Sequence, residues 1–153
     1  MERQAEERKK LVRISVRNLV EFVLRSGDID SRRSGQAQKD AMLEGSRIHR
    51  KIQKRMGSNY RAEVPLKHLV EDEEVTLLVE GRADGIEEEN GAVTIDEIKG
   101  VYMDLERLEE PVPVHLAQAM CYGYFYCCDK GLDGVRLQLT YCNLETEEIR
   151  RFV

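Results

Sequence analysis

The chain has 153 residues, of which 41% are hydrophobic and 35% are charged, and it contains no tryptophan. A chain of this length folds as one domain with a single core, and no apolar run approaches the about 20 residues that a membrane span needs. The start, MERQAEERKK, is charged and has no apolar segment after it, which excludes a secretory signal there. We therefore expect one domain over residues 1–153 with no membrane partner.

Four cysteines stand at positions 121, 127, 128 and 142, without a CxxC spacing. An adjacent pair such as Cys127 and Cys128 rarely cross-links with itself, so this pattern predicts free thiols. Free thiols are typical of a reducing compartment, and we expect a cytoplasmic protein.

The net charge of −5 hides an asymmetry along the chain. Residues 1–67 carry 17 lysines and arginines against 9 acidic residues, whereas residues 68–153 carry 7 against 20. A basic half beside an acidic half suits a protein that binds a polyanion with one surface and holds cations with another. The alternative is that both charge runs are solvated faces.

The first half of the chain predicts two helices and a strand-rich segment. Ser15 can cap a helix whose apolar positions recur at helical spacing up to Leu24, before Gly27 ends it. Residues 26–36 form a polar loop, and residues 37–56 form a second helix. Ala41, Gly45, Ile48, Ile52 and Met56 share the core-facing side of that helix, and its other side is basic, with Arg47, Arg50, Lys51, Lys54 and Arg55. Strand-like runs follow at 60–70, 75–86 and 92–99.

The second half predicts one helix and a hairpin. Pro111 and Pro113 precede a helix over residues 115–128 that Gly131 ends, and runs at 135–142 and 147–153 pair as a hairpin. This order of elements predicts an α/β domain with a central mixed β-sheet flanked by helices. Residues 1–14 form a charged N-terminal segment, residues 37–128 carry the motifs, and the end inside a strand-like run suggests a fragment of a longer chain.

Asn90 and Gly91 give the strongest short turn signal, because both residues of a type I′ hairpin turn need positive φ. A turn there pairs positions whose numbers sum to 181, which places Asp84 opposite Glu97. Side chains alternate along a strand, so Lys99 shares the face of Glu97. Opposed residues have Cβ atoms about 4.5–5.5 Å apart, so two carboxylates and an ammonium meet in one patch.

Two facing carboxylates repel each other unless a cation or a shared proton compensates their charge. One alternative is an exposed lattice in which Arg82 neutralises Glu97 and Lys99 neutralises Asp84. Apolar neighbours on the same face, namely Ile86, Val93 and Ile95, indicate a helix-covered face and favour a cation site. Asp84, Glu97 and the backbone carbonyl of Ile98 can supply oxygen ligands to a hard ion such as magnesium. A lysine at the rim can stabilise charge on phosphorus, which is typical of phosphodiester hydrolysis.

The same residues carry a family resemblance. GRADGI followed by IDEIKG resembles the core of PD-(D/E)xK nucleases, with Asp84 as the first acid and Glu97-Ile98-Lys99 as the (D/E)xK motif. GSRIH at 45–49 resembles the GxxxH segment of the RecB-like branch, and QAMCY at 118–122 resembles its QxxxY motif. The matched region covers residues 44–126 in the expected order. The resemblance implies a restriction-endonuclease-like fold.

The resemblance also implies roles. His49, Asp84, Glu97 and the Ile98 carbonyl would hold Mg²⁺ or Mn²⁺, and Asp84, Glu97 and Lys99 would be catalytic. Gln118 and Tyr122 would face the active site, and His115, one turn earlier, is a lesser candidate for a phosphate contact. Alternatively, His49 is a packed core residue beside the apolar stripe, and Gln118 and Tyr122 are an ordinary i,i+4 helix pair.

Some features depart from the family. Iron-sulfur members of the RecB-like group place one cysteine before the nuclease core and three after it, whereas all four cysteines here lie at position 121 or beyond, so we expect no cluster. Ala83 replaces the proline of the family name. Glu44 and Glu80 could join the metal shell or be surface charges.

We therefore expect a metal-dependent DNA nuclease, with exonuclease action on DNA ends or single strands, in DNA repair or processing. The pattern from ISVRNLVEFVLRSGDI to YCNLETEEIRRF resembles the nuclease module before a Rad3/XPD-like bacterial helicase, which implies a helicase domain in the same chain. A second hypothesis is a nuclease-fold module that binds nucleic acid or scaffolds an assembly without cutting. A third is an acidic protein-interaction domain whose basic helix is only a solvated face.

Overall fold

The computed structural model describes residues 10–24 and 35–153, with the side chains of its second helix described from Gly45 on. The elements, in chain order, are β1 (Lys10–Ser15), α2 (Val16–Val23), α3 (Gly35–Lys54), β2 (Tyr60–Glu71), β3 (Val75–Glu89), β4 (Ala92–Val101), the short 3-10 helix η1 (Leu105–Arg107), α4 (Pro113–Lys130), β5 (Arg136–Asn143) and β6 (Ile149–Phe152). The end of the first helix at Gly27, the inward face of Ala41 and the side chain of Glu44 lie outside the described residues.

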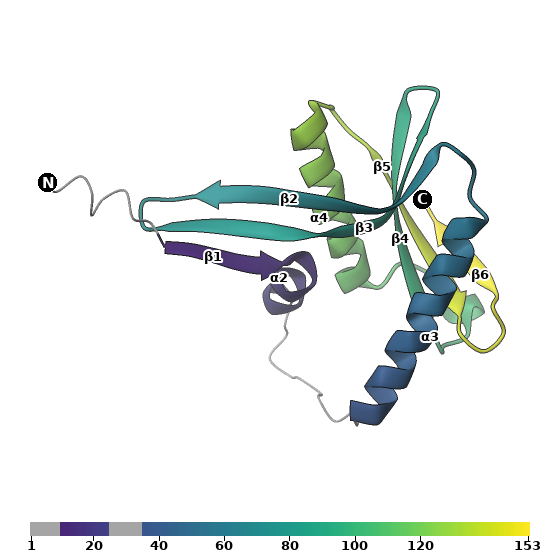
Figure 1. Ribbon diagram of the computed structural model, residues 1–153. Coiled ribbons are helices and arrows are strands. Elements are labelled where there is room, and N and C mark those ends of the chain that lie inside the picture. Colours follow the sequence, from purple (N-terminus) through teal and green to yellow (C-terminus); the bar gives the residue numbers. More distant parts are fainter. Residues whose placement is uncertain (1–9, 25–34) are drawn as a thin grey trace, which may run out of the picture.

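The six strands form one mixed sheet in an α/β fold. β1 runs parallel to β3 and β4 runs parallel to β5, whereas the β2–β3, β3–β4 and β5–β6 pairs are antiparallel. β1, β2 and the first half of β3 form an arm that extends from the rest of the molecule, while α3 crosses the end that holds β4, β5 and β6 (Figure 1).

β3 has three strand neighbours, and their placement divides the sheet. β2 pairs along one edge of β3, from Thr76 to Glu87. On the other edge, β1 pairs as far as Glu80, and β4 pairs only from Gly85 on. Residues 81–84 of β3 therefore have no strand neighbour on that edge, and the sheet splits there between β1 and β4.

Helices cover both faces of the sheet, because alternate residues of the central strands are apolar on both sides. Ile95 of β4 packs in a cluster with Val16 and Val20 of α2 and with Tyr122 of α4. Ile98, on the opposite face of the same strand, packs with Ile48 and Ile52 of α3. Glu97 and Lys99 share the face of Ile95, so they point to the side covered by α2 and α4.

The helix ends follow the signals in the sequence. Ser15 caps α2, because its side chain accepts a hydrogen bond from the Asn18 amide at 3.1 Å, a contact of the kind that contributes about 1 kcal/mol. Pro113 stands in the first turn of α4, and Gly131 ends that helix with a left-handed φ of 68°. Among the described residues, no helix is long and apolar enough to cross a bilayer.

The predicted strands, the last helix and the hairpin are confirmed within a few residues, and the second helix begins at Gly35 rather than at residue 37. The sequence did not predict strand β1 (Lys10–Ser15), which overlaps the end of the charged N-terminal segment. Val12 and Ile14 alternate with exposed residues there, and both are half-buried against the sheet. The charged residues before them conceal this short alternation.

A candidate active site at the split in the sheet

The hairpin turn has the predicted register. Asn90 and Gly91 both have positive φ, at 53° and 82°, and Gly85 pairs with Asp96 while Glu89 pairs with Ala92. The ladder ends one residue before the predicted pair of Asp84 and Glu97. In its place, the Ile98 amide donates a hydrogen bond to Asp84 Oδ2 at 2.6 Å, so a side chain occupies the position of a backbone acceptor.

α3 approaches the split from one side and holds Asp84 in two ways. His49 Nδ1 lies 3.4 Å from Asp84 Oδ1, and Gln53, one turn later on the same flank of the helix, donates its side-chain amide to the Asp84 carbonyl at 2.8 Å. The sequence motifs did not point to Gln53, although its i,i+4 spacing from His49 was available as a signal.

Glu97 and Lys99 lie beside this pair on β4. Lys99 Nζ is 3.1 Å from Glu97 Oε2, and the two side chains are only 6% and 16% exposed. The alternative of an exposed lattice, in which Arg82 pairs with Glu97 and Lys99 pairs with Asp84, is therefore wrong. Lys99 compensates Glu97, and His49 compensates Asp84.

The two carboxylates perturb the titration of the groups around them. Burial, and then the charge of Asp84, raise the pKa of Glu97 to about 8. Burial alone would lower the pKa of His49, but its hydrogen bond to Asp84 and the charge of that carboxylate outweigh burial and raise it. Glu97 Oε1 is buried without a hydrogen-bond partner, and a buried acceptor in that state is costly.

The donor set fits a hard divalent ion. Two carboxylates and an imidazole are ligands that Mg²⁺ and Mn²⁺ accept, and Glu97 Oε1 is an orphan acceptor that a cation would satisfy. No group of three or more His, Cys, Asp or Glu side chains is gathered around one cation position within residues 10–24 and 45–153. The carboxylates instead turn toward His49, Lys99 and the Ile98 amide, which supply the compensating charge and hydrogen bonds.

α4 brings the two residues of the predicted QxxxY motif to the same face of the sheet. Gln118 and Tyr122 are 4% and 7% exposed, and Gln118 Oε1 has no hydrogen-bond partner. A Cβ at Gly81 would lie 2.5 Å from the Tyr122 hydroxyl, so this oxygen packs directly on the part of β3 that has neither β1 nor β4 beside it. Burial, followed by the charges of Glu97 and Asp84, raises the Tyr122 pKa, which places the phenol within electrostatic reach of both acids.

His115 is held by β5. Its Nδ1 lies 2.9 Å from the Tyr141 hydroxyl, which accepts a hydrogen bond from the Val112 amide at 3.0 Å and is thus free to donate to the imidazole. Burial, and then the charges of Lys99 and Arg17, lower the pKa of His115 to about 4. The ring is therefore neutral at pH 7, and in the tautomer protonated at Nε2 it accepts this hydrogen bond at Nδ1.

Arg17 is a second residue to which the sequence motifs did not point. It stands in the first turn of α2, two residues after Ser15, the last β1 residue that pairs with β3 before the split. Its side chain is exposed, and its charge acts on both His115 and Tyr122. Its place beside the split depends on the pairing of β1 with β3, a strand that the sequence did not predict.

The basic residues of α3 lie on a different flank from His49 and Gln53. Arg47 and Lys51 pair with Glu147 in the turn between β5 and β6. Arg50, Lys54 and Arg55 are exposed. The structure therefore brings His49, Asp84, Glu97 and Lys99 together. It leaves apart from them the five basic residues of the helix that carries His49, which we expected to guide a nucleic-acid backbone toward the metal.

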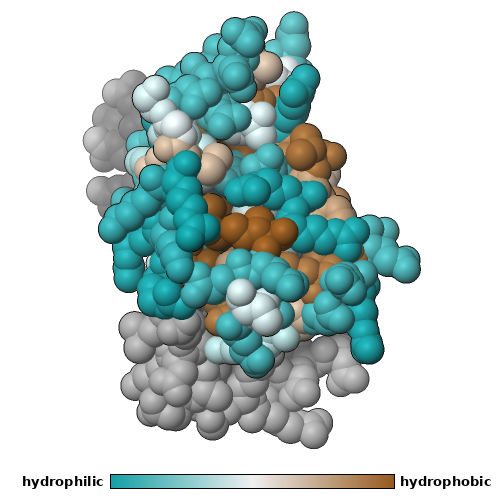
Figure 2. Space-filling view, turned by 90° about the vertical axis from the view of Figure 1, so that its right-hand side faces the viewer, coloured by the Kyte–Doolittle hydropathy of each residue, from teal (hydrophilic) through white to brown (hydrophobic). Residues whose placement is uncertain are grey.

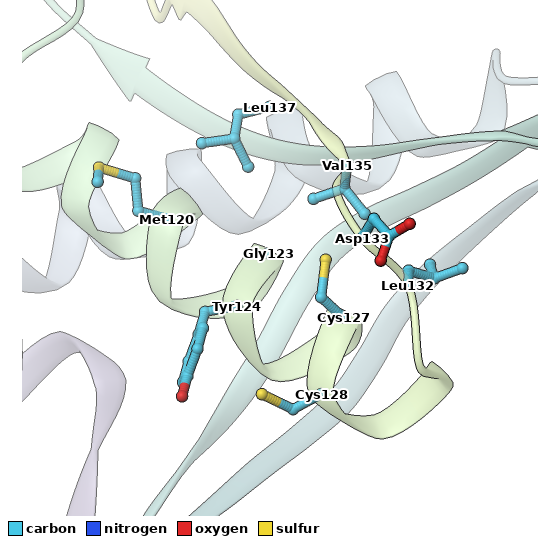
Figure 3. Close-up of a pocket in the computed structure, with 9 residues that line it drawn as sticks. All are labelled: Met120, Gly123, Tyr124, Cys127, Cys128, Leu132, Asp133, Val135 and Leu137. Atoms are coloured by element: carbon cyan, nitrogen blue, oxygen red, sulfur yellow. The ribbon is translucent and has the colours of Figure 1, made fainter.

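Two other features lie apart from the site. Asp96, on the opposite face of β4, is 1% exposed and accepts hydrogen bonds from Thr140 at 2.6 Å and Tyr60 at 2.8 Å, which makes it a satisfied structural acid. A shallow pocket between α4 and the start of β5 has an apolar lining and contains none of the site residues (Figure 3). Its thiols, Cys127 and Cys128, form no disulfide, nor do Cys121 and Cys142.

Comparison with known proteins establishes the fold. No protein-family model matches the chain, and no curated protein matches it. Among solved structures, that of SSO0001 superposes on 99% of this chain and 70% of that chain, with a TM-score of 0.63 and 18% sequence identity. At this identity the match shows a shared α/β fold, with a mixed central sheet and flanking helices.

Proposed function

We propose that the chain is a metal-dependent DNA nuclease of the RecB-like PD-(D/E)xK class. One observation carries the proposal: His49, Asp84, Glu97 and Lys99 converge on the split in the sheet, where Glu97 Oε1 is buried without a partner. Repelling buried carboxylates destabilise a fold unless they serve a function, and perturbed acids in such a place are typical of catalytic sites.

His49, Asp84, Glu97 and the Ile98 carbonyl would hold the ion, Mg²⁺ or Mn²⁺. When bound, a divalent ion of this kind supplies a more acidic water and stabilises negative charge on a phosphate. The cysteine pattern does not match that of an iron-sulfur cluster, so none is proposed.

The remaining side chains have distinct roles in this proposal. Lys99, 3.1 Å from Glu97, stabilises charge that develops on the scissile phosphate. Gln118 and Tyr122 contact the substrate from α4, and neutral His115 offers its free ring nitrogen as a hydrogen-bond donor to a phosphate oxygen. Arg17 adds a guanidinium at the rim, which suits a flanking phosphate.

Action on DNA ends or single strands, a role in DNA repair or processing, and a helicase partner in the same chain are parts of the proposal that rest on the family resemblance. The competing function is a nuclease-fold module that binds DNA without cutting. One observation favours it: within the described residues, the acids and histidine do not surround one cation position.

Single substitutions separate the two functions. Asp84→Ala and Glu97→Ala should abolish Mn²⁺ binding, measured by calorimetry, together with cleavage of an end-labelled single strand. Lys99→Ala should leave the ion bound and slow cleavage by about two to four orders of magnitude, because it acts on the phosphate rather than on the ion. His49→Ala should weaken Mn²⁺ binding more than Mg²⁺ binding, since a nitrogen ligand favours manganese.

Glu89→Gln is the matched control, because Glu89 is exposed on the same hairpin and its loss changes the net charge by one unit. It should bind the ion and cut DNA as the wild type does. DNA binding without cleavage in either ion, or an Asp84→Ala variant as active as the wild type, would favour the non-cutting module.

A further inference from the structure

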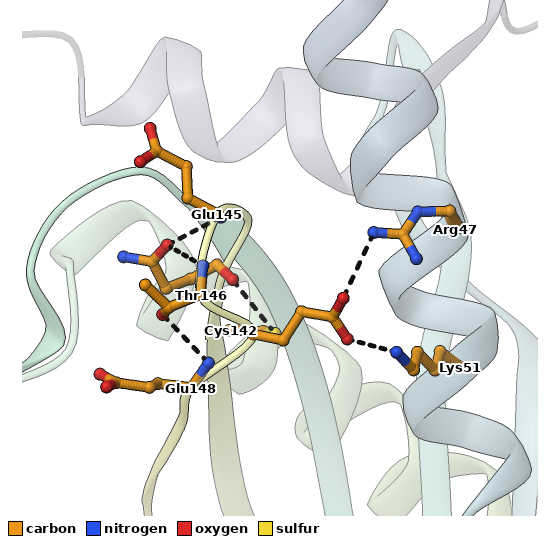
Figure 4. A network of polar contacts seen from close by, with 8 residues as sticks. Arg47, Lys51, Cys142, Glu145, Thr146 and Glu148 are labelled. Atoms are coloured by element: carbon orange, nitrogen blue, oxygen red, sulfur yellow. Dashed lines mark hydrogen bonds and ion pairs between the residues drawn. The ribbon is translucent and has the colours of Figure 1, made fainter.

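Two basic side chains of α3, Arg47 and Lys51, contact a carboxylate from a distant part of the chain. Glu147, in the turn between β5 and β6, contacts Lys51 Nζ through Oε1 and lies 3.8 Å from Arg47 Nη2 through Oε2 (Figure 4). The hydrogen bond from Lys51, together with the charges of the basic side chains, lowers the pKa of Glu147. The side chains are 39–46% exposed, so water and solutes reach the cluster.

The turn does not need this carboxylate to keep its shape. Asn143 Oδ1 accepts hydrogen bonds from the Glu145 and Thr146 amides at 2.8 and 3.1 Å, and the Glu147 amide donates to the Asn143 carbonyl at 2.8 Å. The Asn143 side-chain amide also donates to the Met103 carbonyl at 3.0 Å. Backbone and asparagine contacts therefore hold the turn, and the Glu147 side chain is left to act on α3.

The backbone at Glu147 is also unusual for its residue type. Its φ is 62°, in the left-handed region that glycine or asparagine adopts more readily. A glutamate there is disfavoured by backbone sterics, so its side chain must contribute something that the turn itself does not require.

Three more cations border this cluster. Arg50 and Lys54 on the same helix, and Arg55 directly after it, are exposed, and among the described residues none of them forms an ion pair. The side of the molecule on which α3 and β6 lie is largely hydrophilic, with apolar atoms in a narrow area between polar side chains (Figure 2). A helix flank with several exposed cations is suited to an extended polyanion rather than to an apolar partner.

We infer that this flank, defined by Arg47, Lys51 and Arg55, binds a phosphate of the nucleic-acid backbone, and that the Glu147 carboxylate is a built-in competitor which the phosphate displaces. The inference deepens the proposed function and rests on it. A carboxylate and a phosphate use the same hydrogen-bond donors and the same charge, so the two exclude each other. Every strand must displace the Glu147 carboxylate to bind this flank. Glu147 thus weakens most the binding of a strand that contacts the flank without also reaching the candidate active site.

The test compares Glu147→Gln with Glu148→Gln, two variants with the same net charge and neighbouring positions in the turn. Glu148 is exposed and forms no ion pair with another described residue, so its variant reports the general effect of the lost charge. Binding of a fluorescent 20-nucleotide single strand is measured in EDTA over a series of KCl concentrations, and cleavage is measured in Mn²⁺.

Glu147→Gln should bind about 3- to 10-fold more tightly than Glu148→Gln at low salt. The slope of the logarithm of its binding constant against the logarithm of the KCl concentration should be steeper by about 0.7 for each additional phosphate of a single strand that the flank neutralises. Adding Lys51→Ala to Glu147→Gln should remove most of the increase in affinity, whereas Lys51→Ala alone should change wild-type affinity less, because Lys51 is then already occupied.

The outcomes separate this inference from the proposed function. If the wild type binds and cuts DNA while the two glutamine variants stay within twofold of each other at every salt concentration, the Glu147 inference is wrong and the nuclease stands. If the variants differ as expected and nothing cuts, the inference stands and the nuclease proposal is wrong. If no variant binds the strand, both are wrong.

Discussion

Glu97 combines burial, like charge and an unpartnered oxygen in one side chain. It is 5% exposed, Asp84 lies close enough to raise its pKa, and Lys99 compensates only one of its two oxygens. Without a divalent ion, the ionised form of such a residue opposes folding, because a buried charge is poorly solvated and the neighbouring acid repels it. The same features are what make it a suitable ligand.

Glu97→Gln should therefore stabilise the metal-free protein. In EDTA at pH 7.5 we expect the free energy of unfolding to rise by about 1–2 kcal/mol, because the amide has neither a charge to bury nor a proton to take up on folding, and it keeps the shape and an acceptor for Lys99. Urea unfolding measures this quantity, with Glu89→Gln as the surface control that should change it by less than about 0.5 kcal/mol. A Glu97→Gln protein no more stable than the wild type would mean that Lys99 already compensates the carboxylate fully.

At the scale of an element, the candidate site lies on β3 at the point where one edge of this strand exchanges one partner strand for another. β1 leaves at Glu80 and β4 joins at Gly85, so the intervening backbone is open to α4. Gly81 lies in this interval, and the absence of a side chain there lets the Tyr122 hydroxyl reach the backbone. The position of the Tyr122 phenol thus requires a residue without a Cβ at position 81.

Gly81→Ala tests that dependence. Its Cβ would lie 2.5 Å from the Tyr122 hydroxyl, which must move, and cleavage should fall by about tenfold with a loss of stability near 1 kcal/mol. Gly134→Ala, where nothing lies within 4 Å of the new Cβ, should change neither quantity. Because the alanine acts through the Tyr122 side chain, the double variant Gly81→Ala/Tyr122→Phe should be no slower than the slower single variant. Additive losses would show that Gly81 acts in another way.

At the scale of the whole molecule, the sequence predicts what depends on local patterns. Asn90-Gly91 fixes the register from Glu89 to Gly85, and the apolar spacing of α3 identifies Ile48 and Ile52 as buried. The sequence does not reveal that the ladder between β3 and β4 stops at Gly85 and that β1 takes the same edge of β3 as far as Glu80. β1 is a short strand preceded by charged residues, so its pattern is weak.

Long-range partners are the other part that the sequence does not reveal. Nothing near Lys51 in the chain indicates that Glu147 will occupy it, and helical periodicity alone does not say which flank of α3 faces Asp84. The charge asymmetry of the two halves suggests such contacts without naming the residues. Tertiary packing decides them.

Acid stability of the whole fold should depend on His115. Burial and the charges of Lys99 and Arg17 lower its pKa to about 4 in the folded protein, below the ordinary value of 6.5. The unfolded chain therefore takes up a proton first as the pH falls, so the folded state loses stability progressively between about pH 6.5 and pH 4. Below pH 4 the loss is complete and no longer grows.

His115→Gln removes this titration and keeps a side chain that can bond to the Tyr141 hydroxyl. The ring is partly solvated, and with that allowance the wild type should lose about 1–2 kcal/mol more than the variant between pH 7 and pH 5. Carboxylates and His49 titrate in both proteins, so the difference between the two unfolding curves isolates His115. Urea unfolding at half-unit pH steps measures it. Parallel curves from pH 7 to pH 4 would show that His115 keeps an ordinary pKa, and that Lys99 and Arg17 do not act on it across the split in the sheet.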